Sequence, residues 1–443
     1  MKGRMGMKRN ALLTLAVWML LLALLIPMAA CTQEQGQEQG SDTVTETEAE
    51  TLPPAVDPES YGYADVTYKC QDNSILRTYK GKSADDFTGV RSFYLQNGYS
   101  VYSESEKAEN LFCTLVNGSA MAHMYWIKSS GELNVVTSKT AGDTLPPAQS
   151  PEIMQGAVKP VVTQMRDSSN VNGMCYIVQL PDGSFIVYDG SYDKRAKKVM
   201  AQIEDMHVGG GVPLIRAWVL THSHDDHHPT FGYFCNNYAD EVKVEYVIFA
   251  PIESELGKKI GGDNYFNTDI HADIAKLGAK TVYAHTGMEF AFGDFKLEVL
   301  LAADDLFKVE NHNNYFNNSS LVTRIYTEDY SVLFTGDIGK EGTALMTEMY
   351  GDYLKSNICQ VSHHGVEDVP LEFYELVEAS ILYYPCNKWL YDQKERHYDV
   401  RKALEERSYT KEILIAGLGQ YTREWGTTFA EDAELSMPDY KKK

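Results

Sequence analysis

Six ionisable side chains follow one apolar run in the stretch WVLTHSHDDHHPTF. His222 and His224 are two residues apart in extended chain, so both imidazoles point to the same side and can bind one divalent ion. Asp226 and His227 come where the chain turns toward a helix, and can reach a second ion. Imidazole together with carboxylate suits zinc, iron or manganese. The spacing therefore predicts a metal site that begins here.

Three further apolar runs end in residues that can bind metal. Asp337 follows SVLFTG, where a carboxylate can bridge two ions, and His363 and His364 follow ICQVS. Asp189 ends SFIVYD, where an Asp-Gly turn explains the residue as well as a functional role does. Because ligands gather at strand ends in layered α/β folds, we expect these groups to converge. His312, in ENHNNYFNN, is a weaker candidate ligand.

A solvated, histidine-rich loop is the simplest alternative for the first motif. The later TGD and SHHG motifs, in that order, favour a metal site over this alternative. Within the first motif, Asp225 and His228 are interpreted as bystanders. The sequence has no G-x-S-x-G nucleophile elbow and no cysteine pair with metal-ligand spacing, so neither covalent serine catalysis nor a cysteine-bound metal is indicated.

The elements that must position these groups alternate along most of the chain. Over 151–430, strand-like runs such as RAWVLT and YSVLFTGD alternate with helix-like stretches, which predicts a layered α/β domain. Over 59–150, short alternating runs such as YADVTYKC and RSFYLQNGYSVYSE are separated by turn signals, which predicts an antiparallel, β-rich region. Residues 431–443 form a polar tail.

The start of the chain predicts export. In residues 1–31, basic residues precede a long apolar stretch that ends in two small residues and Cys31, as in a secretory signal. It resembles a bacterial lipoprotein signal, which implies a lipid on Cys31 and a protein tethered to the outer face of the cytoplasmic membrane. An uncleaved membrane anchor is the alternative. Residues 32–58 are rich in Gln, Glu, Thr and Gly, and are expected to be a disordered linker.

The formal net charge of -22 bears on the substrate. A strongly negative protein does not attract polyanions over long range. A local cationic site, such as a pair of metal ions, can still bind a phosphate group.

The motifs together resemble the metallo-β-lactamase superfamily of hydrolases, and within it the exported hydrolase domain of ComEC-type DNA-uptake proteins. The resemblance rests on CYIVQLPDGSFIVYDGSYD, VLTHSHDDHHPTF, NNSSLVTRIYTEDYSVLFTGDI, CQVSHHGV and a weaker distal YPCNKW...RHYDVRKALEER. It spans residues 173 to 408. It implies an αββα sandwich with a dinuclear site at its edge, preceded here by the β-rich region.

The resemblance also implies a role for each ligand. His222 and His224 hold the first ion, and Asp337 bridges. Asp226, His227 and one of the paired histidines hold the second ion. We favour His363 over His364, because His363 directly ends the strand. Zn²⁺ is the favoured metal, with Mn²⁺ or Fe²⁺ as alternatives.

Two positions depart from the superfamily pattern. The stretch that often supplies a third histidine to the first ion reads NNSS at 317–320, as in the ComEC-like branch, and HPT replaces the usual Gly-Gly after the first motif. In the distal piece, His397 aligns with a family histidine near the substrate, which implies contact with the substrate or leaving group.

These features predict a hydrolase that uses a metal-bound hydroxide. Asp226 or Asp337 would orient the water and a histidine such as His397 would protonate the leaving group. Phosphodiesters are the expected target, in nucleic acid or in phosphocholine-type esters, with nucleic acid a partner only as substrate. A lactone or β-lactam hydrolase is the alternative within the class. A non-catalytic binding lipoprotein that keeps the fold is the alternative outside it.

Overall fold

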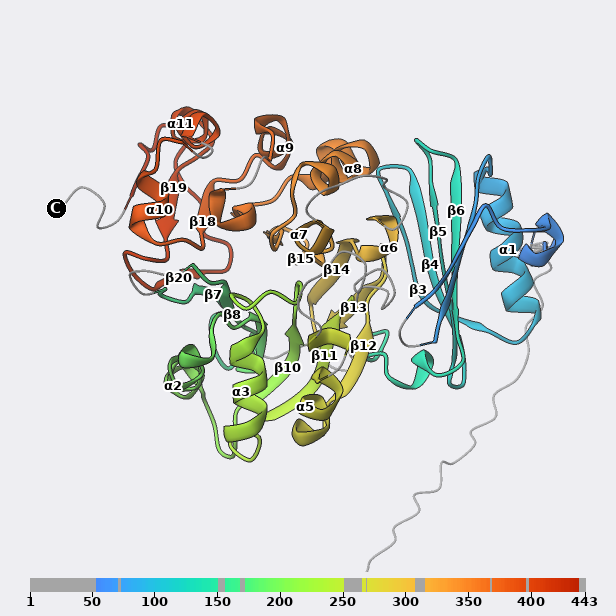
Figure 1. Ribbon diagram of the computed structural model, residues 1–443, viewed down its shortest axis with the longest axis horizontal. Helices are drawn as coiled ribbons and strands as arrows, with labels where there is room; N and C mark the ends of the chain where they lie inside the picture. Colours follow the sequence, from blue (N-terminus) through green and yellow to red (C-terminus); the bar gives the residue numbers. More distant parts are fainter. Residues whose placement is uncertain are drawn as a thin grey trace, which may run out of the picture. The chain divides into compact units, whose positions relative to one another are not determined.

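A computed structural model describes the chain from residue 53 onward, with short gaps (Figure 1). Leu52–Lys443 form one compact unit. The predicted signal with Cys31, most of the predicted linker, His312 and His397 lie outside the described residues. No helix in the described part of the chain is both long and apolar enough to cross a bilayer. The described residues are 53–70, 73–149, 156–167, 172–250, 265–267, 269–306, 315–366, 369–395 and 398–437.

Two seven-stranded sheets form the α/β domain. The first has the order β12 (Lys280–Tyr283), β11 (Lys243–Phe249), β10 (Leu214–Val219), β9 (Phe185–Asp189), β8 (Cys175–Gln179), β7 (Val161–Gln164), β20 (Tyr421–Glu424). The second has the order β13 (Glu289–Phe292), β14 (Phe295–Leu301), β15 (Val322–Tyr326), β16 (Ser331–Phe334), β17 (Ile358–Gln360), β18 (Ile381–Tyr384), β19 (Glu412–Ile415). Strands β9 to β12 pair in parallel, as do β16 to β19. The predicted site residues in the described part of the chain lie at or after the carboxyl ends of β9, β10, β16 and β17.

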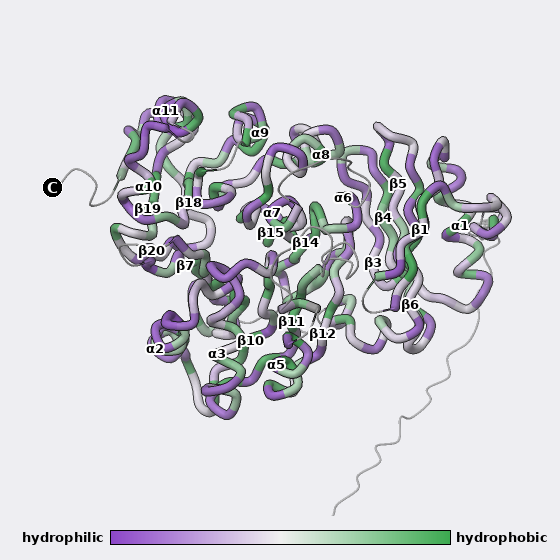
Figure 2. Tube along the Cα trace, viewed as in Figure 1, coloured by the Kyte–Doolittle hydropathy of each residue, from purple (hydrophilic) through white to green (hydrophobic). Residues whose placement is uncertain are grey.

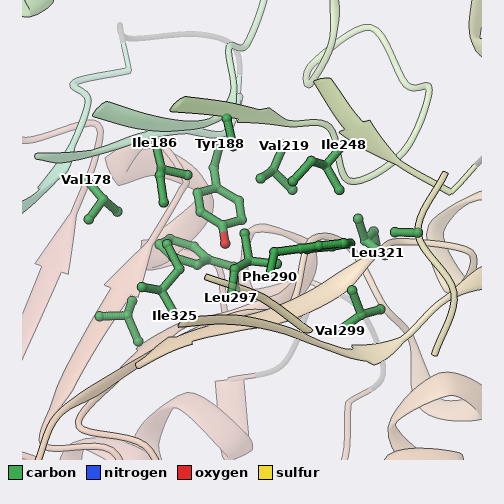
Figure 3. Close-up of a cluster of buried hydrophobic side chains, with 14 of the residues drawn as sticks. Val178, Ile186, Tyr188, Val219, Ile248, Phe290, Leu297, Val299, Leu321 and Ile325 are labelled. Carbon is green, nitrogen blue, oxygen red and sulfur yellow. The ribbon is translucent and has the colours of Figure 1, made fainter. Parts of the chain in front are cut away.

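The core lies between the two sheets. Tyr188, Val219 and Ile248 of the first sheet pack against Leu297 and Ile325 of the second, and all five are fully buried (Figure 3). Fully burying one such side chain contributes about 1.5–3 kcal/mol. Because both faces are covered at the centre of each sheet, β8, β9, β17 and β18 are buried along their whole length rather than on alternate residues.

Helices cover the outer faces of both sheets (Figure 1). Apolar residues of three helices pack on the first sheet: α2 (Ala196–Met206), α3 (Pro229–Asn237) and α5 (Ile270–Leu277). The second sheet is covered by α8 (Lys340–Tyr350), α9 (Leu371–Val377) and α11 (Tyr398–Glu406). The short helices are α6 (Ala303–Leu306), α7 (Tyr315–Asn318) and α10 (Lys388–Asp392). The predicted αββα sandwich after a β-rich region is confirmed.

The N-terminal region is a six-stranded antiparallel sheet with one helix. Its strand order is β1 (Val66–Lys69), β2 (Ile75–Tyr79), β6 (Glu132–Ser138), β5 (Ala120–Ile127), β4 (Asn110–Asn117), β3 (Ser100–Lys107). Hydrophobic residues gather along β4 and β5 (Figure 2). The prediction that RSFYLQ is strand-like was wrong, because these residues end helix α1 (Ala84–Gln96). Ser83 and Asp86 form a capping box that fixes the start of this helix.

This sheet packs directly on the sandwich. Phe112 of β4 lies over Gly287, where a Cβ atom would come within 1.8 Å of the ring, so only glycine fits. The Tyr125 hydroxyl donates a hydrogen bond to Asp305 over 2.9 Å. Lys107 forms a buried ion pair with Glu298 of β14 at 2.8 Å. The N-terminal sheet and the sandwich therefore share one buried interface.

Candidate metal centre

The first motif lies in the turn between β10 and α3. Thr221 anchors it, because its backbone N–H and hydroxyl both donate to the Asp189 carboxylate, over 2.8 and 2.7 Å. The next residue, His222, places its Nε2 3.0 Å from Nδ1 of His224. The two imidazoles are thus brought together, as their spacing predicts.

Asp337 lies at the centre of the cluster. It follows β16 through Gly336, whose φ of 55° and close approach to Ser320 and Thr221 exclude a side chain there. The Asp337 backbone N–H donates to the Ser320 hydroxyl over 2.9 Å, which fixes the turn. Four imidazoles surround the Asp337 Oδ2 atom: Nε2 of His227 at 3.2 Å, His364 at 3.5 Å, His363 at 3.8 Å and His222 at 3.9 Å.

The paired histidines after β17 contact different partners. His363 and His364 both have left-handed backbone, with φ of 44° and 56°. This conformation costs roughly 1–2 kcal/mol for each non-glycine residue, so the surrounding fold must hold it. Nε2 of His364 lies 3.1 Å from the Asp226 carboxylate, while Nε2 of His363 lies 3.2 Å from the Asn317 amide nitrogen.

This geometry differs from the preference for His363 beside Asp226 and His227. The ligand atoms of Asp226, His227, Asp337 and His364 all lie within 4.8 Å of one another, and the structure places His364 in that set. Two consecutive left-handed residues turn the second side chain, rather than the first, toward Asp226. The order of residues after a strand does not show such a turn.

Asp189 is a buried anchor. Its backbone is left-handed, with φ of 49°, as the Asp-Gly turn interpretation allows. Its carboxylate also lies 2.7 Å from Nδ1 of His227. An imidazole that donates from Nδ1 to a carboxylate directs Nε2 away from it, and here Nε2 faces Asp337. Asp189 thus combines both interpretations, as a turn residue that orients His227.

Interactions between opposite charges outweigh the effect of burial on the pKa values of Asp337 and His364. Burial lowers the pKa of His222 and of His224. Burial also acts to lower the pKa of His364, but Asp337 and Asp226 outweigh it and raise that pKa to about 10. Although burial acts to raise the pKa of Asp337, the neighbouring imidazoles bring it well below its ordinary value. The carboxylates are therefore ionised and ready to face a cation.

The donor set fits a divalent metal ion. It consists of imidazole nitrogens and carboxylate oxygens, which are the ligands of zinc, iron and manganese. Among the described residues, no donor reaches the Asp337 Oδ1 atom, although this oxygen is buried. A buried carboxylate oxygen without a partner is destabilising, and a cation would supply the missing interaction.

The two bystanders and His123 lie outside this cluster. The His228 ring stacks on Tyr265 with centroids 4.2 Å apart, and the Asp225 side chain is 81% exposed. The His123 ring is buried between Thr114 and the Thr286 carbonyl, as a structural histidine is expected to be. Thr221, Ser320 and Asn317 support the cluster through hydroxyl, backbone and amide contacts, which no motif spacing indicates.

The family match agrees with this fold. The family model described as "Metallo-beta-lactamase superfamily" matches residues 169–378. No curated protein matches the chain. Among solved structures, it is similar to the metallo-β-lactamase fold protein YhfI of Bacillus subtilis, at 12% identity over 60% of this chain and 100% of that chain, with a TM-score of 0.36.

Two further solved structures are similar over part of the chain. One is CmlA of Streptomyces venezuelae, a diiron β-hydroxylase, at 13% identity over 59% of this chain and 45% of that chain, with a TM-score of 0.30. The other is Zn²⁺-bound PqqB of Methylobacterium extorquens, at 9% identity over 45% of this chain and 69% of that chain, with a TM-score of 0.28. The family match and the converging strand ends identify residues 169–378 as a domain of the metallo-β-lactamase superfamily.

Proposed function

We propose that this protein is a metal-dependent hydrolase of phosphodiester bonds that uses two divalent ions, most readily Zn²⁺. The observation that carries the proposal is the Asp337 Oδ2 atom, which has four imidazole nitrogens within 3.9 Å. Such a carboxylate can serve two ions at once. Superfamily members bind divalent metals, often zinc or iron, and are commonly hydrolytic.

The ions would supply Lewis acidity, which lowers the pKa of water and offsets charge on a phosphoryl oxygen. The protein's own residues decide where this happens. Asp189 orients His227, and Asp337 is buried between the two histidine sets. The Asp226 side chain is 24% exposed, whereas that of His227 is fully buried. Asp226 is therefore the carboxylate best placed to accept a proton from a water that enters with the substrate.

The charge of the protein favours a small ester over a polymer. With a net charge of -22, the chain repels polyanions over long range. A phosphocholine-type ester carries a compensating cation and avoids most of this repulsion. Within the superfamily, NNSS at 317–320 and CQVSHHGV support a place beside ComEC-type hydrolase domains, and favour phosphodiesters over β-lactams.

The test is a substrate comparison with the full chain in detergent, loaded with Zn²⁺ or Mn²⁺. We expect hydrolysis of bis(p-nitrophenyl) phosphate and p-nitrophenyl phosphorylcholine, and little or none of a lactone or a chromogenic cephalosporin. Asp337→Asn should abolish turnover, while Asp225→Asn, in the same motif as Asp226 but exposed, should retain it. Faster turnover of the lactone or cephalosporin would contradict the proposal. Bound metal without turnover of any ester would support the non-catalytic binding alternative.

We also propose that a lipid on Cys31 anchors the protein to the outer face of the cytoplasmic membrane. The support is the signal-like sequence before Cys31 and the linker-like composition after it. A labelled fatty acid should be incorporated into the wild-type chain and not into Cys31→Ser. Equal labelling of both chains would rule the anchor out.

A further inference from the structure

The two predicted ion positions have unequal ligand sets. The second position has Asp226, His227 and His364 around it, with Asp337 shared. The first position has only His222 and His224 from the first motif. The stretch 317–320, where many superfamily members place a third histidine, has no imidazole.

His363 lies where that third imidazole is needed. Its Nε2 is 3.8 Å from the Asp337 Oδ2 atom, and Nε2 of His222 is 3.9 Å from the same atom. His363 and His222 are thus almost equally far from the shared carboxylate oxygen. His364 belongs to the set of donors whose ligand atoms all lie within 4.8 Å of one another, whereas His363 is outside that set.

Asn317 prepares the His363 ring for this role. Its amide nitrogen lies 3.2 Å from the Nε2 atom of His363, and an amide nitrogen can only donate a hydrogen bond. The Nε2 atom is then the unprotonated nitrogen of the ring, and a cation at the first position would replace the Asn317 hydrogen bond at its lone pair. Asn317 is 5% exposed, so the residue that replaces the missing histidine is itself part of the buried wall of the site.

We propose that His363 supplies the third imidazole of the first ion, while His364 serves the second ion and Asp337 is shared. Adjacent histidines at one turn would thereby be divided between two metals, and the left-handed backbone at both residues produces this division. The inference rests on the proposed function only in requiring that both ions bind.

The test measures metal binding rather than turnover. The full chain in detergent is stripped with a chelator and titrated with Mn²⁺ by calorimetry, and bound metal is counted by mass spectrometry. Electron paramagnetic resonance reports whether two Mn²⁺ ions are close enough to couple. The variants are His363→Gly and His364→Gly, because glycine accepts the positive φ at both positions. His363→Asn is a second choice that also tolerates this backbone.

The wild type should bind about two Mn²⁺ ions per chain with a coupled signal. His363→Gly should weaken one ion at least about tenfold, the lower end of the loss caused by removing an outer-shell partner. The decisive comparison uses His222→Ala, in which the first position is already impaired. Adding His363→Gly to it should leave the affinity of the remaining ion unchanged, whereas adding His364→Gly should weaken that ion at least about tenfold.

Two results would overturn the inference. One is that His363→Gly alone binds both ions as tightly as the wild type. The other is that His363→Gly weakens the remaining ion in the His222→Ala background, which would place His363 at the second position with His364. Failure of the proposed function is a separate result, because a chain that binds metal as described but hydrolyses no phosphodiester keeps this division of ligands.

Discussion

The Asp189→Asn substitution tests whether the buried Asp189 carboxylate orients His227 for metal binding. Asp189 is fully buried and accepts three hydrogen bonds: two from Thr221, at 2.8 and 2.7 Å, and one from Nδ1 of His227 at 2.7 Å. Asparagine has the same shape and tolerates the left-handed backbone, so neither the volume nor the turn changes. The substitution removes the negative charge. It also replaces one carboxylate oxygen by an NH2 group, which faces a hydrogen-bond donor of Thr221 or His227.

The expected magnitude follows from those contacts. Leaving one buried donor unsatisfied costs about 1–3 kcal/mol of folding free energy. Loss of a carboxylate behind a metal-binding histidine typically weakens metal affinity by about 10–100-fold, which is about 1.4–2.7 kcal/mol. We therefore expect Asp189→Asn to lower both stability and affinity, although Asp189 itself is outside the clustered donor set.

Urea unfolding of the chelated protein measures the first effect, and Zn²⁺ or Mn²⁺ titration of the folded protein measures the second. The matched control is Asp225→Asn, because it removes the same charge from an 81% exposed side chain in the adjacent motif. The control should stay within about 0.5 kcal/mol of the wild type in stability. If Asp189→Asn binds metal as tightly as the control does, Asp189 does not orient His227 and this reasoning is wrong.

Three other outcomes follow from the structure. Burial, together with the neighbouring His285, lowers the pKa of His123 from 6.5 to about 3. As the pH falls below about 6.5, only the unfolded chain takes up this proton, so the free energy of unfolding declines by about 1.4 kcal/mol per pH unit. His123→Gln should remove that part of the slope in urea melts compared between about pH 7 and pH 5, and an unchanged slope would contradict it. Phe112→Ala should destabilise the chain by about 3–5 kcal/mol in urea melts, because the ring is 1% exposed and packs over Gly287. A loss below about 1 kcal/mol would mean that this interface does not stabilise the N-terminal sheet. Chelation should lower the melting temperature, since metal at 100 times its dissociation constant adds about 2.7 kcal/mol to the stability of the folded state, and a scan unaffected by chelator would argue against a metal centre.

The sequence alone determined which strands would carry chemistry. His222, Asp337 and His363 each follow an apolar run, and parallel strands bring their carboxyl ends to one edge. The layered fold followed from the alternation of strand-like and helix-like runs over 151–430. These features are local, because periodicity and turn residues are set by neighbours in the chain.

Helix α1 shows where local pattern failed. RSFYLQ contains aromatic and apolar residues in a spacing that suits a strand as well as a helix. The capping box at Ser83 and Asp86 precedes this segment in the chain and marks the start of the helix, of which RSFYLQ is the last part. Short apolar runs leave this ambiguity because packing, rather than propensity, decides between the two.

The tertiary structure alone decided how the donors are shared. Which of His363 and His364 faces Asp226 depends on two left-handed residues, whose backbone the surrounding contacts hold. The anchoring role of Asp189 depends on a contact with His227 across 38 positions of sequence. Side-chain direction at a turn and proximity between distant segments are properties of the packed chain, so the sequence identified the groups of this centre and the fold assigned their positions.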